Sequence, residues 1–117
     1  MKVKTLPQLK RLADRLAGGI CRDKGICEAK GHKIECDGPY QWAHILSRRF
    51  HATRWLPQNS LCLCRSHHAL FTYNPDEWIM FLINNYEETY IWLYEKKNTF
   101  VKINRSFMEK TIKELEV

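Results

Sequence analysis

Five cysteines in a chain of 117 residues constrain the fold more than any other feature of the sequence. Cysteines form disulfides in secreted proteins and bind metal ions in cytosolic ones. The N-terminus, MKVKTLPQLKRLADRL, lacks the apolar stretch and cleavage site of a secretory signal, and the cysteine count is odd. Both observations favour thiolates on a metal ion over disulfides. Because no apolar run reaches about 18 residues, we also expect a cytoplasmic protein without a membrane segment.

The sequence CRSH at 64–67 is a C-x2-H knuckle at the junction between a predicted strand and a predicted helix. Two residues between the ligands let both side chains turn toward one ion, and a closed tetrahedral zinc site needs two more ligands. Cys21, Cys27 and Cys36 precede the first strand, and the last two flank an excursion just ahead of it. Cys62 is expected to face away from Cys64 and to be a buried thiol. The predicted ligands of a structural Zn2+ are Cys27, Cys36, Cys64 and His67, with Cys21 as the alternative to either of the first two.

Positive charge is concentrated in the middle of the chain. The formal net charge is +6, and residues 38–75 contain four arginines and no acidic residue. Residues 1–37 carry nine basic and five acidic residues, whereas residues 76–117 carry six and eight. A field of one sign on one segment suits a polyanion such as nucleic acid, although a basic solubilising surface is the simpler alternative.

Hydrophobic spacing predicts a short hairpin between helices. Leucines at helical spacing indicate an N-terminal helix that ends at Gly18 and Gly19. Short strands are expected at 40–46 and 60–63, and a helix at 65–73.

The remainder is expected to be helical. Asn74 and Pro75 are typical of a helix start, and further helical stretches follow near 87–96 and from about residue 104. The sequence thus predicts one α+β domain over 1–117. Its parts are an N-terminal helix (1–19), a zinc-stabilised core (20–75) and a helical extension (76–117).

Four segments of the chain resemble the phage-type HNH endonucleases, which are ββα-metal or His-Me finger nucleases. They are WAHILSRR at 42–49, ATRW at 52–55, NSLCLCRSHH at 59–68 and NPDEW at 74–78. The resemblance spans roughly residues 20–80 and places His67 where the family's second knuckle cysteine stands. The family's usual C-x2-C would place a cysteine at Lys30, so Cys36, or else Cys21, is taken as its substitute.

The resemblance implies a ββα fold that holds His44, Asn59 and His68 around one divalent ion. The residue matching His44 is the general base that activates a water, a task that suits a neutral imidazole. The residue matching His68 binds a catalytic Mg2+, Mn2+ or Ni2+ ion, and Asn59 orients His44. DNA cleavage with little sequence specificity would leave 3′-hydroxyl and 5′-phosphate ends. The basic loop between the strands would hold the DNA backbone through Arg48, Arg49 and Arg54.

One departure from the family's pattern keeps two other interpretations open. Many relatives have Asp or His directly before the catalytic histidine as a second metal ligand, and this chain has Ala43. A zinc-stabilised nucleic-acid-binding module without catalysis would need neither His44 nor Asn59. Alternatively, the C-terminal helices would dock a protein partner, for instance in a phage DNA-packaging complex. Nicking, double-strand cleavage and any oligomeric state are equally compatible with the sequence.

Overall fold

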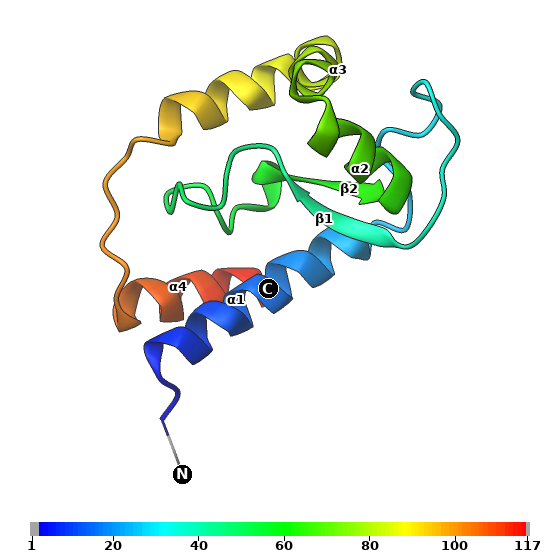
Figure 1. The fold of residues 1–117 in the computed structure, drawn as a ribbon. Helices are drawn as coiled ribbons and strands as arrows, with labels where there is room; N and C mark the ends of the chain where they lie inside the picture. Colours follow the sequence, from blue (N-terminus) through cyan, green and yellow to red (C-terminus); the bar gives the residue numbers. More distant parts are fainter. Residues whose placement is uncertain (1–2, 117) are drawn as a thin grey trace.

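The structure, a computed structural model, describes residues 3–116 and contains helices around a two-stranded antiparallel sheet. β1 pairs with β2 so that Tyr40 lies opposite Cys64 and His44 opposite Ser60. This arrangement confirms the predicted α+β class. In chain order the elements are α1 (Leu6–Arg22), β1 (Tyr40–His44), a 3-10 helix η1 (Pro57–Asn59), β2 (Ser60–Cys64), α2 (Arg65–Tyr73), α3 (Pro75–Lys96) and α4 (Arg105–Leu115), as Figure 1 shows.

α1 begins with a capping box and continues past its two glycines. The Thr5 hydroxyl accepts a hydrogen bond from the Gln8 backbone N–H at 3.3 Å, and the Gln8 side chain accepts one from the Thr5 N–H at 2.8 Å. The prediction that the helix ends at Gly18 and Gly19 is wrong, because both lie inside α1. A Cβ added at Gly18 would lie only 3.2 Å from the Trp42 ring. Close packing against β1 therefore outweighs the low helix propensity of glycine.

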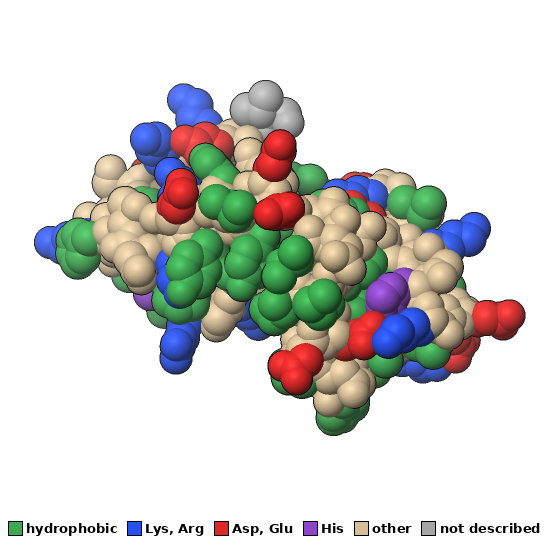
Figure 2. All heavy atoms as spheres, turned by 90° about the horizontal axis from the view of Figure 1, so that it is seen from above, with side chains coloured by type: hydrophobic (Ala, Val, Ile, Leu, Met, Phe, Trp, Pro, Cys, Tyr) green, Lys and Arg blue, Asp and Glu red, His purple; other side chains and the backbone are tan. Residues whose placement is uncertain are grey.

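α3 combines the two helical stretches that the sequence predicts over residues 75–96. It is interrupted at Tyr86, whose backbone angles (φ −140°, ψ 35°) are not helical. Part of its surface is apolar and open to solvent, and hydrophobic side chains gather on this side of the molecule (Figure 2). The exposed apolar residues of α3 are Ile79, Met80, Ile83, Ile91, Trp92 and Tyr94. None of the described helices is long and apolar enough to cross a membrane.

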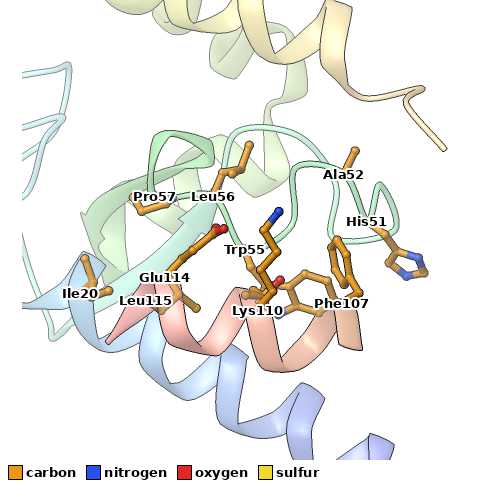
Figure 3. Close-up of a pocket in the computed structure, with 11 residues that line it drawn as sticks. Ile20, His51, Ala52, Trp55, Leu56, Pro57, Phe107, Lys110, Glu114 and Leu115 are labelled. Atoms are coloured by element: carbon orange, nitrogen blue, oxygen red, sulfur yellow. The ribbon is translucent and has the colours of Figure 1, made fainter. Parts of the chain in front are cut away.

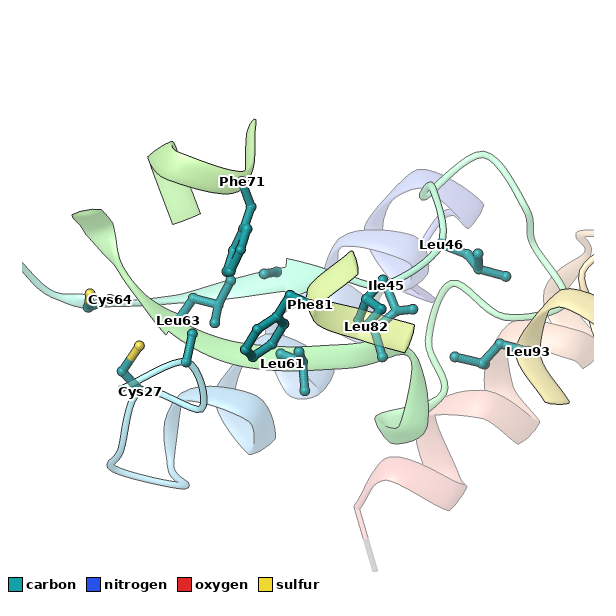
Figure 4. Close-up of a cluster of buried hydrophobic side chains, with 12 residues drawn as sticks. Cys27, Ile45, Leu46, Leu61, Leu63, Cys64, Phe71, Phe81, Leu82 and Leu93 are labelled. Atoms are coloured by element: carbon teal, nitrogen blue, oxygen red, sulfur yellow. The ribbon is translucent and has the colours of Figure 1, made fainter. Parts of the chain in front are cut away.

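The hairpin lies between two helical layers (Figure 1). On one side, α1 and α4 pack against each other and enclose Trp55, and Trp42 of β1 packs against this cluster. On the other side, α2 and α3 cover the sheet through a cluster that contains Ala43, Leu61 and Leu63 (Figure 4). A two-stranded hairpin is marginal in water by itself, so burial of both faces is what stabilises it.

Candidate metal centre and histidine cavity

Four side chains meet beside the end of β2, two from the loop before β1 and two from the junction of β2 and α2. The metal-ligating atoms of Cys27, Cys36, Cys64 and His67 all lie within 4.8 Å of one another. His67 Nδ1 is 3.6 Å from Cys27 Sγ, 3.7 Å from Cys36 Sγ and 3.2 Å from Cys64 Sγ. A tetrahedral zinc ion with ordinary Zn–S and Zn–N bonds separates sulfur and nitrogen by about 3.6 Å. The cluster therefore fits a metal ion and is consistent with a structural zinc site.

The junction between β2 and α2 sets the positions of two of these ligands. Cys64 is the N-cap of α2, and its sulfur accepts a hydrogen bond from the His67 backbone N–H at 3.4 Å and contacts Ser66 Oγ at 3.2 Å. Burial by itself would raise the pKa of the Cys64 thiol. Hydrogen bonds from Ser66 and from the His67 and Asp37 backbones outweigh that effect and lower the pKa to about 5. Cys64 is thus prepared to act as a thiolate.

A hydrogen bond at the ring nitrogen that faces away from the sulfurs orients the imidazole of His67. Its Nε2 donates to the His32 carbonyl oxygen at 2.9 Å, which leaves the Nδ1 lone pair facing the sulfurs. The His32 ring is itself held, with Nε2 2.8 Å from Glu77 Oε1 on α3 and the ring edge-on to Phe81. The metal centre is therefore tied to α3 as well as to the hairpin. Neither His32 nor Glu77 forms a recognisable motif, so this support of the His67 ring could not be predicted from the sequence.

The other two cysteines stay outside the cluster. Cys21 is buried inside α1 rather than in the loop after it, and Cys62 is buried on β2, as expected for a thiol that is not a ligand. The expectation that Cys62 faces away from Cys64 is wrong, because residues two apart on a strand share a face. Position along the hairpin separates them instead, since Cys62 lies opposite Trp42 and Cys64 opposite Tyr40.

His44 and His68 line one small cavity of about 110 Å³ between the hairpin and α2. His68 Nδ1 lies 2.7 Å from the Gln41 side-chain oxygen, so Nδ1 carries the proton and the lone pair is left on Nε2. Gln41 on β1 is a positioning residue that sequence reasoning missed, because only strand pairing brings it to α2. The remaining residues that line the cavity are Ala43, Leu63, Phe71, Thr72 and Trp78.

His44 is a neutral imidazole near neutral pH. Its Nε2 is buried and has no hydrogen-bond partner among the described residues. Burial first, and then the charge of Arg48, lower the pKa of His44 to about 4. The ring packs against Trp42 at a centroid distance of 4.2 Å. An unpaired buried nitrogen is uncommon in folded proteins and can mark a functional group.

Asn59 fastens the chain directly after His44. It lies in η1 rather than in β2, and it is fully buried. Its side-chain oxygen accepts from the Leu46 N–H at 2.8 Å, and its side-chain NH2 donates to the Leu46 carbonyl at 3.1 Å. Asn59 does not line the histidine cavity. The structure therefore brings His44 and His68 together at one cavity. Asn59 lies outside this cavity and holds the backbone of Leu46, two residues after His44.

The three predicted DNA-binding arginines differ in their surroundings. Arg54 is 14% exposed and forms a two-pronged ion pair with Asp14 of α1, at 3.2 and 2.7 Å. Arg48 is 58% exposed and is 3.3 Å from the same carboxylate. Arg49 is exposed and has no ion pair within residues 3–116. Asp14, which the sequence also did not single out, thus anchors the basic loop to α1.

A separate cavity of about 430 Å³ lies between this loop, α1 and α4 (Figure 3). It is larger than the histidine cavity but includes none of the predicted catalytic residues or metal ligands. Most of its lining is apolar, namely Ile20, Ala52, Trp55, Leu56, Pro57, Phe107 and Leu115.

Mutation of Asn59 to Ala should destabilise the fold strongly. The change removes two hydrogen bonds and leaves the buried N–H and C=O of Leu46 without partners, which costs about 2–4 kcal/mol. Urea unfolding would measure the loss. Asn84→Ala, at an exposed position on α3, is the control and should change stability by less than about 0.5 kcal/mol. Equal stability of the two variants would contradict a stabilising role for the hydrogen bonds between Asn59 and Leu46.

Acid should destabilise the protein through His44. The pKa of this group is about 4 in the folded chain and about 6.5 in the unfolded chain, so the unfolded state binds more protons between these values. Stability is therefore expected to fall as the pH drops from about 6.5 to about 4, by at most about 3 kcal/mol. Unfolding free energies of wild type and His44→Gln across this range would isolate the contribution. If the unfolding free energies of the two proteins changed in parallel with pH, the contribution of His44 would be ruled out.

The geometry thus consists of a Cys3His cluster suited to a metal ion and, beside it, two histidines around one cavity. The two parts share α2, because His67 belongs to the cluster and His68 to the cavity. No protein-family model, curated protein or solved structure matches this chain.

Proposed function

We propose that this protein is a metal-dependent endonuclease of the HNH type that hydrolyses phosphodiester bonds in DNA. The observation that carries the proposal is the neutral His44, whose Nε2 is buried and unpaired and whose residue lines one cavity together with His68. The order β1–β2–α2, with the cluster at the β2–α2 junction, supports its description as a zinc-stabilised ββα finger.

His44 would act as the general base. A lone pair on Nε2 takes a proton from the attacking water, and the water oxygen forms a bond to phosphorus. The P–O3′ bond then breaks, the departing O3′ takes a proton from solvent water, and the products are a 3′-hydroxyl and a 5′-phosphate. Because Asn59 holds the peptide groups of Leu46, two residues after His44, it limits the movement of the base away from the cavity.

His68 would hold the catalytic divalent ion through Nε2. When bound, such an ion polarises the phosphate and stabilises the leaving oxygen. No carboxylate lines the cavity, and the Thr72 hydroxyl is engaged with the His68 carbonyl oxygen at 2.7 Å. The donors of this chain therefore fit an ion that is shared with DNA phosphates and held weakly without them.

The exposed arginines would hold the DNA backbone, and Arg49→Ala tests this role. Arg49 is free of ion pairs in the described structure, whereas Arg54 is engaged with Asp14. We expect Arg49→Ala to weaken DNA binding and to reduce the slope of log affinity against log salt by about 1. Fluorescence anisotropy at several salt concentrations measures both. Lys113→Ala, at an exposed position on α4, is the charge-matched control, and an identical slope for both variants would contradict the role.

A zinc-stabilised DNA-binding module without catalysis is the second candidate. The absence of acidic side chains around the histidine cavity favours it, because His68 would be the main protein ligand of a catalytic ion. This module would bind DNA but would not cut it.

Plasmid cleavage separates the two candidates. Supercoiled DNA is incubated with the protein and Mg2+, Mn2+, Ni2+ or EDTA, beside His44→Ala and His51→Ala. His51 lies on the same loop but outside the histidine cavity, so its variant should keep the activity. Nicked or linear product that requires metal and His44 supports the nuclease. DNA binding without cleavage under every metal would favour the noncatalytic module.

A further inference from the structure

One ligand of the metal centre differs from the other three in its access to solvent. Cys36 is exposed, whereas Cys27, Cys64 and His67 are buried. A cavity of about 530 Å³ is lined by all three cysteines, and a second one of about 490 Å³ is also lined by Cys36. A small reagent in water can therefore reach the sulfur of Cys36 from outside.

The backbone around Cys36 has little regular structure. It belongs to neither a helix nor a strand, and residues 28–39 contain three left-handed residues, Gly31 (φ 89°), Lys33 (φ 58°) and Gly38 (φ 85°). Cys64, by contrast, is fixed at the end of β2 and caps α2. Hydrogen bonds from Ser66 of α2 hold the residues on both sides of Cys36, since the Ser66 hydroxyl donates to the Glu35 carbonyl and accepts from the Asp37 N–H. After loss of a bond to a metal ion, the Cys36 sulfur would therefore turn toward its neighbours by rotation of its side chain.

We propose that Cys36 is a peroxide-reactive site whose oxidation releases the metal ion from the cluster. The Cys36 thiolate attacks one peroxide oxygen and becomes a sulfenic acid as the O–O bond breaks and one water leaves. The thiolate of Cys27 or Cys64 then attacks the Cys36 sulfur and forms a disulfide, and the hydroxyl group leaves as a second water. The two sulfurs supply the two electrons that reduce the peroxide, and two protons are taken from solvent.

This chemistry fits the distances in the cluster. The ligand atoms of all four residues lie within 4.8 Å of one another, so a resolving thiolate is already near Cys36. A disulfide removes two of the four donors, and the remaining pair cannot form a closed tetrahedral site. The proposal rests on metal binding by the cluster and not on nuclease activity, so either can fail without the other.

The test uses zinc-loaded protein and hydrogen peroxide, with release followed by a chromogenic zinc chelator. Cys36→His keeps a zinc donor but removes the reactive thiol, so release should be about tenfold slower than in wild type. Cys62→Ala removes a buried thiol outside the cluster and should release zinc at the wild-type rate. Equal rates for Cys36→His and wild type would overturn the proposal.

Differential alkylation with mass spectrometry keeps the test independent of how Cys36→His folds. At substoichiometric peroxide, wild-type protein should show oxidation first at Cys36 and then a disulfide from Cys36 to Cys27 or Cys64. Oxidation that begins at Cys21 or Cys62, or purified protein that binds no zinc, would overturn it.

Discussion

Removal of the metal ion should unfold most of the protein. The cluster joins the segment that contains Cys27 and Cys36 to the junction of β2 and α2, and three of its four side chains are buried. Structural zinc contributes about 10–16 kcal/mol of apparent binding free energy in small zinc-binding peptides. Because a whole domain is stable by only about 5–15 kcal/mol, loss of the ion is comparable to the total stability.

Thermal unfolding with and without a strong chelator measures this effect. We expect the chelator, and equally Cys64→Ser, to lower the melting temperature by more than about 20 °C or to abolish the cooperative transition. Cys62→Ala provides the matched control, since it shortens a buried cysteine outside the cluster and should cost about 1 kcal/mol. A chelator that leaves the transition unchanged would show that the cluster carries no structural ion.

Replacement of His44 by alanine is expected to abolish most of the cleavage without weakening DNA binding. A positioned general base contributes about 10²–10⁴ in rate, so kcat should fall by that factor. The binding arginines lie on the loop after β1, and the Nε2 that is removed makes no hydrogen bond in the described structure. The dissociation constant for DNA should therefore stay close to the wild-type value.

Single-turnover cleavage and anisotropy, measured on the same preparations, separate chemistry from binding. His51→Ala serves as the control histidine and should retain the wild-type rate. Parallel loss of binding and cleavage in His44→Ala would indicate that His44 supports the DNA-binding surface and is not the base. Circular dichroism of both variants establishes that the comparison is between folded proteins.

The sequence was most informative where chemistry or helix geometry acts over short distances. The knuckle spacing of Cys64 and His67 predicted that both would turn toward one point, and Asn74 with Pro75 predicted the start of α3. The preference for Cys27 and Cys36 over Cys21 also agrees with the cluster that the structure contains.

Features that depend on tertiary contacts were not predictable. The end of α1 was misplaced because the packing of Gly18 against Trp42 is invisible in the local sequence. Asp14 and Gln41 gave no signal, since their partners Arg54 and His68 are 40 and 27 residues away. Cys62 stays out of the cluster because of its position along β2, since strand alternation puts it on the same face as Cys64.

The packing of α1 against α4 has a consequence for how the chain folds during synthesis. The cluster that buries Leu9 and Ala13 of α1 is completed by Met108, Ile112 and Leu115 of α4. A nascent chain therefore emerges from the ribosome with the part of the apolar face of α1 that α4 covers exposed until residues 105–115 have also left the exit tunnel. Chains cut before α4 keep this apolar surface exposed and should aggregate or be degraded.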